Sequence, residues 1–392
     1  MHGCLHGVRI VDMTANVSGP FGTAMLGDMG ADVIKIEAPG NGDISRRYGM
    51  MRGGMAAAFA VINRNKRGAA LDLQSAAGKE AFLKLVASAD VVTQNFRPGV
   101  VDRLGVGYEA CKAVKKDIIY ISISGFGDSG PHANDSVYDP VIQAVSGYMG
   151  VQTEPGTDKP MPIRTIVCDK IASMSLTQGV LGALFARERF GMGQHVRISM
   201  LDASLAFLWP DAMSNHTYMG ETPRMPEMGI YHLPASKDGF FVGFVVTDEQ
   251  FQGLCRAIER PDVANDPRFV ETVSRQKNQK ALNVIFTAEV AKYTTAEIVA
   301  RFQREKVPAA KINNRVDLLT DPQIAHNGMI IETEHPDAGP MRTPRPPIIF
   351  GETPSSIRRH APQVGAHTEE VLAEVGYSSG EIAALKAKGA FG

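Results

Sequence analysis

The N-terminal half of the chain alternates short, β-rich apolar runs with segments of helical periodicity. Helices are predicted over Phe21–Asp28, over Ala77–Ala89 and along the stretch that follows Asp169 and stops at Gly191. Alternating strands and helices are typical of an α/β fold, in which a mainly parallel sheet carries helices on both faces. The predicted strands are Val8–Met13, Asp32–Glu37, Gly68–Leu73, Val91–Asn95, Ile118–Ser124 and Gln194–Ser199.

The pattern changes near residue 225. The sequence KDGFFVGFVV (237–246) is typical of one arm of a β-hairpin, and helices dominate after it. Thr294 and Glu297 form a capping box for one of these helices, which we expect to end at Pro308. The Pro-rich run MRTPRPPIIF (341–350) is typical of a linker or an extended crossing. We therefore predict a second, smaller α+β domain over residues 225–320.

Length and charge restrict the class of protein. A chain of 392 residues exceeds one ordinary core and predicts two domains. The net charge of −1 gives no broad basic field, so nucleic acid is not an expected partner. The first residues do not resemble a secretory signal, and no apolar run approaches the roughly 20 residues needed to span a bilayer. We expect a cytoplasmic protein without a membrane partner.

Several cofactor and metal motifs are missing from the sequence. The turn after the first strand, TANVSGPFG, lacks GxGxxG, and no GxxxxGK[ST] occurs, which disfavours nicotinamide, flavin and P-loop nucleotide binding. The cysteines lie far apart without a CxxC pair, and no HExxH occurs, so no metal site is expected. A G-x-S-x-G elbow is also missing, so the sequence disfavours a serine hydrolase of the α/β-hydrolase type.

Asp169 stands just before the long helix and has two interpretations. As an N-cap, its carboxylate would bond the first free amides of the helix. The same geometry would keep the carboxylate ionised and oriented, because the N-terminus of a helix favours negative charge. An ionised carboxylate can attack an activated acyl group, so Asp169 is also a candidate nucleophile.

The run Asn95-Phe96-Arg97-Pro98-Gly99 follows a predicted strand. Its composition suits an ordinary turn. The carboxyl end of a parallel strand is also where open α/β sheets bind ligands, so Phe96 could stack on a purine and Arg97 or Arg103 could meet phosphate. The Gly-rich run at residues 125–131 is either a surface turn or a mobile flap over a site.

Together, many motifs resemble the class III CoA-transferases, the family of formyl-CoA transferases, carnitine CoA-transferases and α-methylacyl-CoA racemases. The resemblance covers essentially the whole chain and is strongest over residues 7–205. The motifs are GVRIVDMTANVSGPFGTAMLGDMGADVIKIEAPGNGD, NRNKRGAALDL, NFRPGVVDRLGVGYE, ISISGFGDSGP, VYDPVIQAVSG, Asp169, GQHVRISMLDA, PPIIFGETP and GAHTEEVLAEVG.

The resemblance implies an interlocked homodimer, in which two chains thread through each other. It implies a discontinuous Rossmann-like large domain that binds CoA, residues 1–205 and 330–392. The small domain at 225–320 would then be joined to it by linkers at 206–224 and 321–329. The active site would lie at the domain and subunit interface. The expected substrates are an acyl-CoA and a carboxylic acid, with coenzyme A as the only cofactor.

The resemblance also implies roles for single residues. Asp169 matches the catalytic aspartate, which attacks the thioester to form a mixed anhydride and then carries CoA as an aspartyl thioester. Val17 and Ser18 fall in the turn that approaches the thioester. The remaining matches concern the nucleotide part of CoA: Leu71 and Asp72 along the adenine, and Asn95, Phe96 and Arg103 around the nucleotide.

The chain departs from the formyl-CoA transferases at three matched positions, where it has Val17, Ala38 and Ser136 instead of Gln, Arg and Lys. The segment Met225–Gly239 has no counterpart of their glycine-rich loop. The small domain would line the acyl pocket around Met225–Leu233, and the apolar content of that segment suggests an acyl group larger than formyl.

Tyr138-Asp139 replaces the His-Asp of the racemases, and a tyrosine with a pKa near 10 is a poor base for α-proton transfer. This favours acyl-CoA:carboxylate CoA transfer, with Asp139 orienting substrate or protecting the intermediate from water. Two alternatives stay open: a 2-methylacyl-CoA racemase or epimerase, and a CoA-thioester-binding protein without turnover.

Overall fold

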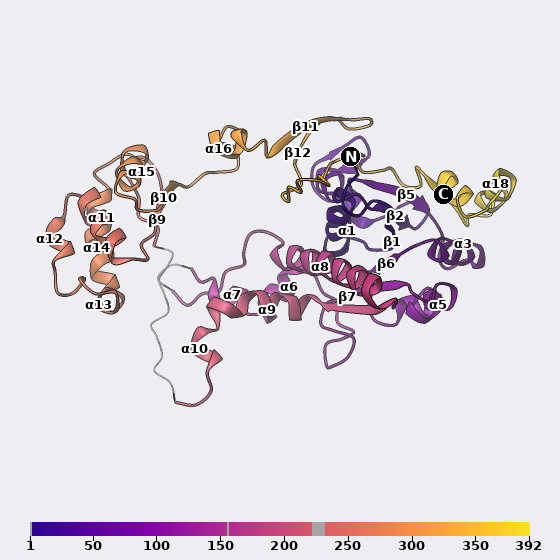
Figure 1. Cartoon of the computed structure of the whole chain (residues 1–392), viewed down its shortest axis with the longest axis horizontal. Coiled ribbons are helices and arrows are strands. Elements are labelled where there is room, and N and C mark those ends of the chain that lie inside the picture. Colours follow the sequence, from indigo (N-terminus) through magenta and orange to yellow (C-terminus); the bar gives the residue numbers. More distant parts are fainter. Residues whose placement is uncertain (1, 155–156, 222–231) are drawn as a thin grey trace. The chain divides into compact units, whose positions relative to one another are not determined.

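The computed structural model describes residues 2–154, 157–221 and 232–392. It divides into two compact units. Unit 1 comprises Met1–Ser214 and Gly328–Gly392, and unit 2 comprises Asn215–Asn327 (Figure 1). The domain boundaries and the linkers at 206–224 and 321–329 stay predictions.

Unit 1 is built on a six-stranded sheet in the order β5-β2-β1-β6-β7-β8. Every neighbouring pair in it is parallel, which confirms the predicted α/β fold. The chain leaves β1 toward β2 on one side and later returns to β6 on the other. The carboxyl ends of β1 and β6 therefore flank the point where strand order reverses, the usual ligand position in such sheets. The strands are β1 Arg9–Asp12, β2 Asp32–Glu37, β5 Lys66–Ala70, β6 Val91–Gln94, β7 Ile119–Ser124 and β8 His195–Ser199.

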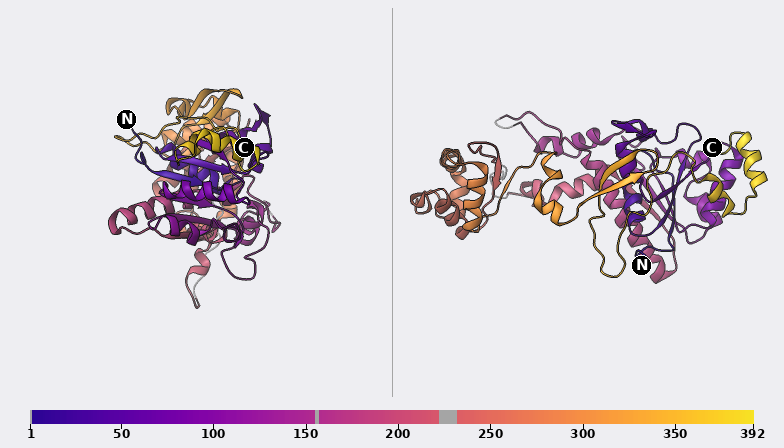
Figure 2. Two further views of the ribbon diagram at one scale, coloured as in Figure 1. Left: turned by 90° about the vertical axis from the view of Figure 1, so that its right-hand side faces the viewer. Right: turned by 90° about the horizontal axis from the view of Figure 1, so that it is seen from above.

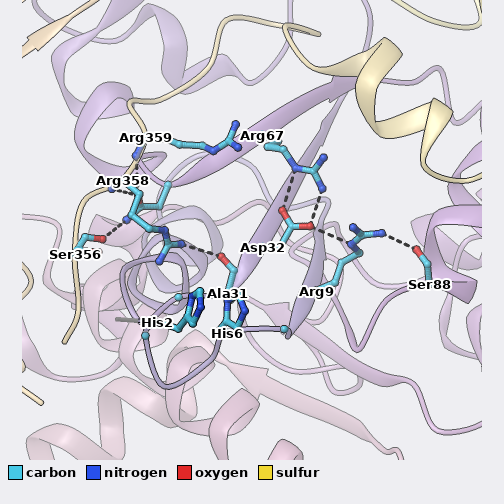
Figure 3. A pocket seen from close by; sticks show the side chains of 14 residues that line it. His2, His6, Arg9, Ala31, Asp32, Arg67, Ser88, Ser356, Arg358 and Arg359 are labelled. Carbon is cyan, nitrogen blue, oxygen red and sulfur yellow. Dashed lines mark hydrogen bonds and ion pairs between the residues drawn. The ribbon is translucent and has the colours of Figure 1, made fainter. Parts of the chain in front are cut away.

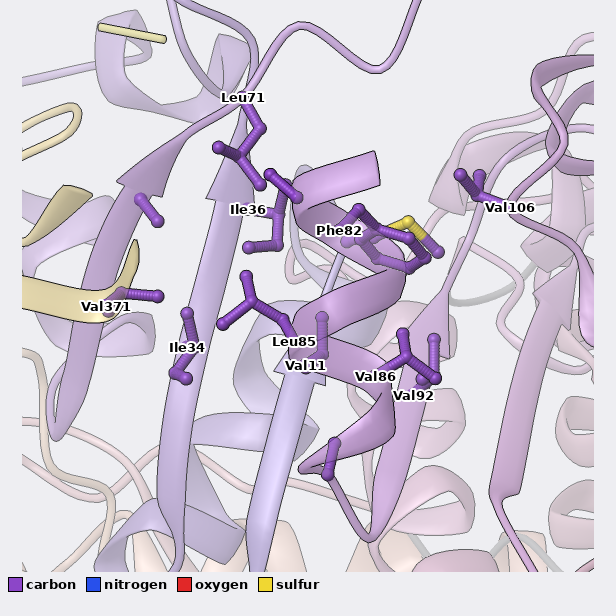
Figure 4. Close-up of a cluster of buried hydrophobic side chains, with 14 of the residues drawn as sticks. Val11, Ile34, Ile36, Leu71, Phe82, Leu85, Val86, Val92, Val106 and Val371 are labelled. Atoms are coloured by element: carbon purple, nitrogen blue, oxygen red, sulfur yellow. The ribbon is translucent and has the colours of Figure 1, made fainter. Parts of the chain in front are cut away.

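Helices cover both faces of this sheet (Figures 1 and 2). On one face, α3 (Ala76–Ala87) packs Phe82, Leu85 and Val86 against alternate strand residues such as Val11 (Figure 4). On the other face, α1 (Ser18–Asp28) and α8 (Val167–Phe190) pack against strand residues that include Ile10. Strands buried on both faces read as nearly continuous apolar runs, which is why the sequence reveals them clearly.

The helices α1 and α8 approach each other closely. A Cβ placed on Gly22 of α1 would lie 2.7 Å from the carbonyl oxygen of Ser173 in α8. Thr177 of α8 also donates to the Gly22 carbonyl at 3.2 Å. The missing side chain of Gly22 therefore permits the close approach of α1 to α8.

Unit 2 is helical with a two-stranded sheet. Its strand β9 (Phe241–Gly243) pairs antiparallel with β10 (Ala309–Lys311), so the predicted hairpin arm pairs with a distant segment instead of an adjacent arm. The capping box of Thr294 and Glu297 is confirmed, but α15 (Thr295–Arg304) ends before Pro308. The short helix α10 (Ser214–Thr217) crosses the boundary between the units. The other elements of unit 2 are α11 Asp248–Ala257, α12 Pro261–Ala264, α13 Thr272–Lys277, α14 Gln279–Val290, η2 Asp317–Leu319 and α16 Pro322–His326.

The Pro-rich run is only partly a linker, because residues 341–344 belong to β12 (Gly339–Pro344), which forms a hairpin with β11 (Ile330–His335). Among the described residues, no helix is long and apolar enough to cross a membrane. The remaining elements of unit 1 are η1 Ile44–Arg47, β3 Met51–Arg52, β4 Met55–Ala56, α2 Ala57–Ile62, α4 Val100–Leu104, α5 Tyr108–Val114, α6 Asp139–Val145, α7 Tyr148–Val151, α9 Met200–Ala212, β11 Ile330–His335, β12 Gly339–Pro344, α17 Thr368–Ala373 and α18 Ser379–Ala387.

Candidate active site

Asp169 lies in the first turn of α8 and only 9% of it is exposed. It is not the N-cap, which is Ile166 and makes no side-chain cap bond. The carboxylate of Asp139 caps the helix instead, accepting the backbone N–H of Cys168 at 2.7 Å and that of Asp169 at 3.1 Å. The N-cap interpretation of Asp169 is therefore wrong, and its carboxylate is free of that task.

Asp139 is a buried residue at the start of α6, where only 2% of it is exposed. Its other oxygen accepts Gln143 Nε2 at 2.5 Å, and Gln143 also donates to the carbonyls of Ile163 and Thr165. This network joins α6 to the segment that enters α8. In the sequence, Asp139 stands next to Tyr138 as a candidate site residue. No local pattern indicates that it caps a helix about thirty residues away.

Burial raises the pKa of the Asp169 carboxyl to about 7, and the neighbouring Asp139 carboxylate acts in the same direction. The backbone N–H of Ser18 acts in the opposite direction and lowers the pKa. Ser18 is the first residue of α1, so the N-termini of α1 and α8 meet at this carboxyl. Near neutral pH, Asp169 is thus divided between the acid and the carboxylate.

Asn95 follows β6 and fixes the turn that leads into α1. Its Oδ1 accepts the backbone N–H of Ala15 at 2.8 Å, and its Nδ2 donates to the carbonyl of Ala15 at 2.7 Å. Nδ2 also reaches Ser18 Oγ at 3.3 Å. Val17, half-buried, is the N-cap residue of α1. The structure therefore brings Asn95, Val17, Ser18 and Asp169 together at the carboxyl ends of β1 and β6.

Phe96, Arg97 and Arg103 continue from the same edge of the sheet. Phe96 is half-buried against the apolar cluster beneath α3, while Arg97 and Arg103 are exposed. Arg97 donates to Ser136 Oγ at 2.7 Å, which links this loop to the segment that precedes Asp139. Gly99 ends the loop in a left-handed conformation, φ 77°, that glycine adopts without strain.

Leu71 and Asp72 directly follow β5. Leu71 is 1% exposed, packs in the core and bridges Phe391 through its backbone, so its side chain cannot face a nucleotide in this structure. The backbone N–H of Asp72 donates to the carbonyl of Ala390 at 2.9 Å.

Tyr138 is 61% exposed and precedes α6. The expected acyl-binding segment Met225–Leu233 lies outside the described residues, apart from His232 and Leu233.

Two further cavities lie in the described part of the chain, and neither is lined by a predicted catalytic or CoA-binding residue. One, of about 460 Å³, lies where β1 and β2 begin, at the opposite edge of the sheet (Figure 3). There Arg9 Nε and Arg67 Nη2 lie 3.0 Å and 2.6 Å from Asp32 Oδ2. The second, of about 740 Å³, lies within unit 2. Among the described residues, no group of three or more His, Cys, Asp or Glu side chains could hold a metal ion.

Comparisons with known proteins agree along nearly the whole chain. The model of a family described as CoA-transferase family III matches residues 5–368. The chain is 35% identical to an acetyl-CoA:oxalate CoA-transferase of Acetobacter aceti, over 92% of this chain and 93% of that protein. It is 32% identical to a succinate–glutarate CoA-transferase of Agrobacterium fabrum, over 95% of each. A solved CAIB/BAIF family protein of Brucella suis is 31% identical, with a TM-score of 0.83 and coverage of 96% and 100%.

Proposed function

Because this chain belongs to CoA-transferase family III, we propose that it moves CoA between an acyl-CoA thioester and a free carboxylic acid through covalent intermediates on Asp169. The observation that carries the proposal is the position of Asp169, a buried carboxyl at the strand-order reversal, beside the Ser18 N–H. Buried surroundings favour this chemistry, because water would hydrolyse an anhydride or an aspartyl thioester.

The reaction proceeds through four acyl exchanges. The Asp169 carboxylate attacks the thioester carbonyl. CoA thiolate departs, and a mixed anhydride forms on Asp169. The thiolate then attacks the Asp169 side of this anhydride, which releases the donor acid and forms the aspartyl-CoA thioester. The incoming carboxylate attacks that thioester, giving a second anhydride and free thiolate. Attack of the thiolate on the new acyl carbon yields the product thioester and restores Asp169.

The surrounding residues receive supporting roles in this proposal. Phe96 would stack on the adenine, and Arg97 and Arg103, both exposed cations, would contact phosphates. Leu71 would contribute its backbone only, because its side chain is buried, while Asp72 would lie along the adenine beside it. Val17 and Ser18 would line the approach of the thioester.

Asp139 would keep the start of α8 in place, given its bonds to the amides of Cys168 and Asp169. Tyr138, exposed beside it, would contact the substrate acid.

The names of the relatives suggest a first substrate panel of acetyl-CoA and succinyl-CoA with oxalate and glutarate. Purified protein is incubated in D2O with these thioesters and ¹³C-labelled free acids, and the thioesters are analysed by mass spectrometry. Transfer predicts that label from the acid enters the thioester without deuterium at C2. A 2-methylacyl-CoA in the same panel tests the racemase or epimerase alternative, and deuterium at its C2 without label would overturn transfer.

A second measurement tests Asp169 directly. Intact-mass spectrometry after addition of acyl-CoA is expected to detect a protein adduct of CoA minus water. The adduct and the label exchange should both vanish in Asp169→Asn. Binding of acyl-CoA without exchange or adduct in the wild type would instead indicate a thioester-binding protein without turnover.

A further inference from the structure

The turn that leads into Ser18 is bonded to a buried ion pair, Lys35 and Asp43. Lys35, on β2, donates from Nζ to the backbone carbonyl of Thr14 at 2.8 Å and to Asp43 Oδ2 at 2.9 Å. Asp43, the N-cap of η1, accepts the backbone N–H of Asn16 on its Oδ1 at 3.0 Å. The two side chains therefore grip the turn at both Thr14 and Asn16.

The turn needs such support, because Asn16 has φ 68°, in the left-handed region that costs a non-glycine residue free energy. The Asn95 bonds to Ala15 hold the same turn from the side of β6. The residue that follows Val17 is Ser18, the first residue of α1, and its backbone N–H acts to lower the pKa of Asp169. Farther along the same two helices, Thr177 of α8 donates to the Gly22 carbonyl of α1 at 3.2 Å. Fixing residues 14–16 thus fixes the start of α1 beside the start of α8, which carries the proposed nucleophile.

Both charges of the pair are fully removed from solvent, with side chains 0% and 1% exposed. Burial opposes the charge of Lys35, but the carboxylates of Asp43, Asp12 and Glu37 outweigh it and raise its pKa. Burial likewise opposes the charge of Asp43, and Lys35 outweighs it and lowers the Asp43 pKa. Because a buried ion pair gives little net stability over apolar residues of similar volume, its stability alone is a weak reason for its presence.

We propose that Lys35 and Asp43 are positioning residues for Asp169: they hold the turn at residues 14–17 so that the Ser18 N–H stays aimed at the carboxylate. This inference rests on the proposed function for its catalytic meaning. Lys35 and Asp43 do not touch Asp169. The titratable groups beside Asp169 are Asp139 from α6 and Cys168 from α8 itself, so the ion pair acts on Asp169 only through the turn.

The decisive variant is Lys35→Met/Asp43→Leu in the full chain, because it removes the grip without leaving an unpaired buried charge. The matched control is Arg64→Met/Asp28→Leu. That pair is also buried in unit 1, at 2.7 Å with side chains 6% and 3% exposed, but Asp28 lies at the far end of α1 from Ser18. Melting temperatures of both variants show how much each change costs in stability.

The first readout is the ¹³C titration of the Asp169 side-chain carboxyl, assigned by its loss in Asp169→Asn. Displacing the Ser18 N–H, which acts to lower the Asp169 pKa, should raise that pKa above its wild-type value. The second readout is the single-turnover rate of the CoA adduct, expected to fall about tenfold because the nucleophile is less well placed. The control should change neither quantity.

A folded Lys35→Met/Asp43→Leu variant with the wild-type titration and rate would overturn the proposal. Equal changes in the control would also overturn it, because they would reflect general destabilisation. The titration does not need turnover: a raised pKa with no adduct in the wild type would uphold the positioning and sink the proposed function.

Discussion

At the scale of the residue, two aspartates of the same site have opposite surroundings. Asp139 is buried but accepts two backbone amides and one side-chain amide. Asp169 is also buried, but desolvation and the neighbouring charge of Asp139 raise its pKa, while the Ser18 N–H acts to lower it. The environment, not the residue type, therefore separates a structural carboxylate from a proposed nucleophile.

The pKa of Asp169, raised to about 7, predicts the pH dependence of its acylation. Only the carboxylate attacks a thioester, so the single-turnover rate should rise with pH and level off above an apparent pKa near 7. Asp139→Asn removes the neighbouring negative charge and should lower this apparent pKa, although burial, the larger cause, remains. A rate that stays flat from pH 5 to 9 would contradict the assignment.

Asp169 is also predicted to cost stability. Between its ordinary pKa of 3.8 and about 7, the folded state binds more protons than the unfolded state, so the free energy of unfolding falls as pH rises through this window. Asp169→Asn abolishes that loss. At pH 8 the variant should be more stable by on the order of 1–2 kcal/mol, and at pH 4 nearly unchanged. Urea unfolding at both values measures the difference, and lower stability at pH 8 would contradict it.

At the scale of the element, the site depends on the close packing of α1 against α8. Their N-termini meet at Asp169, and Gly22 permits the approach because it has no Cβ. The sheet sets the position of α1 through the short turn after β1, while Asp139 of α6 sets the start of α8. Small shifts between these helices would separate Ser18 from Asp169.

Two glycine substitutions test this packing. Gly22→Ala places a methyl group 2.7 Å from the Ser173 carbonyl and should destabilise the protein by about 1–3 kcal/mol and slow adduct formation. Gly182→Ala is the control in α8, because its Cβ would meet nothing within 4 Å. It should raise stability by about 0.5–1 kcal/mol through helix propensity and leave the rate unchanged. Thermal unfolding and single-turnover kinetics read both effects, and a harmless Gly22→Ala would contradict the role of the contact.

At the scale of the whole molecule, we propose that the chain works as an interlocked homodimer. The surface of the described part supports a partner, since α8 and α9 leave Phe185, Phe190, Phe207 and Trp209 largely exposed. Exposed aromatic side chains of this kind are enriched at protein interfaces. The resemblance of the sequence to the class III CoA-transferases supplies the expectation that the partner is a second copy.

Light scattering should accordingly give about twice the chain mass of 42.2 kDa. Threaded chains can part only when they unfold. Two differently tagged preparations should therefore not exchange subunits in native buffer, but should form mixed dimers after joint unfolding and refolding. Rapid native exchange would contradict interlocking while leaving an ordinary dimer, and a monomeric mass would contradict both.

The sequence by itself determined the sheet. Each strand is buried on both faces and so appears as an apolar run, and the predicted strands differ from the observed ones by a few residues at their ends. It also determined the family, because many motifs recur in order. The capping box at Thr294 was equally readable, since both partners lie within one helical turn.

Only the tertiary structure decided how the site is assembled. The bond between Asp139 and the start of α8, the grip of Lys35 and Asp43 on the turn, and the pairing of β9 with β10 all join residues that no local pattern connects. The raised pKa of Asp169 belongs here too. An aspartate at a helix start predicts an ionised carboxylate, but burial beside a second carboxylate outweighs the helix and holds the proposed nucleophile near neutrality.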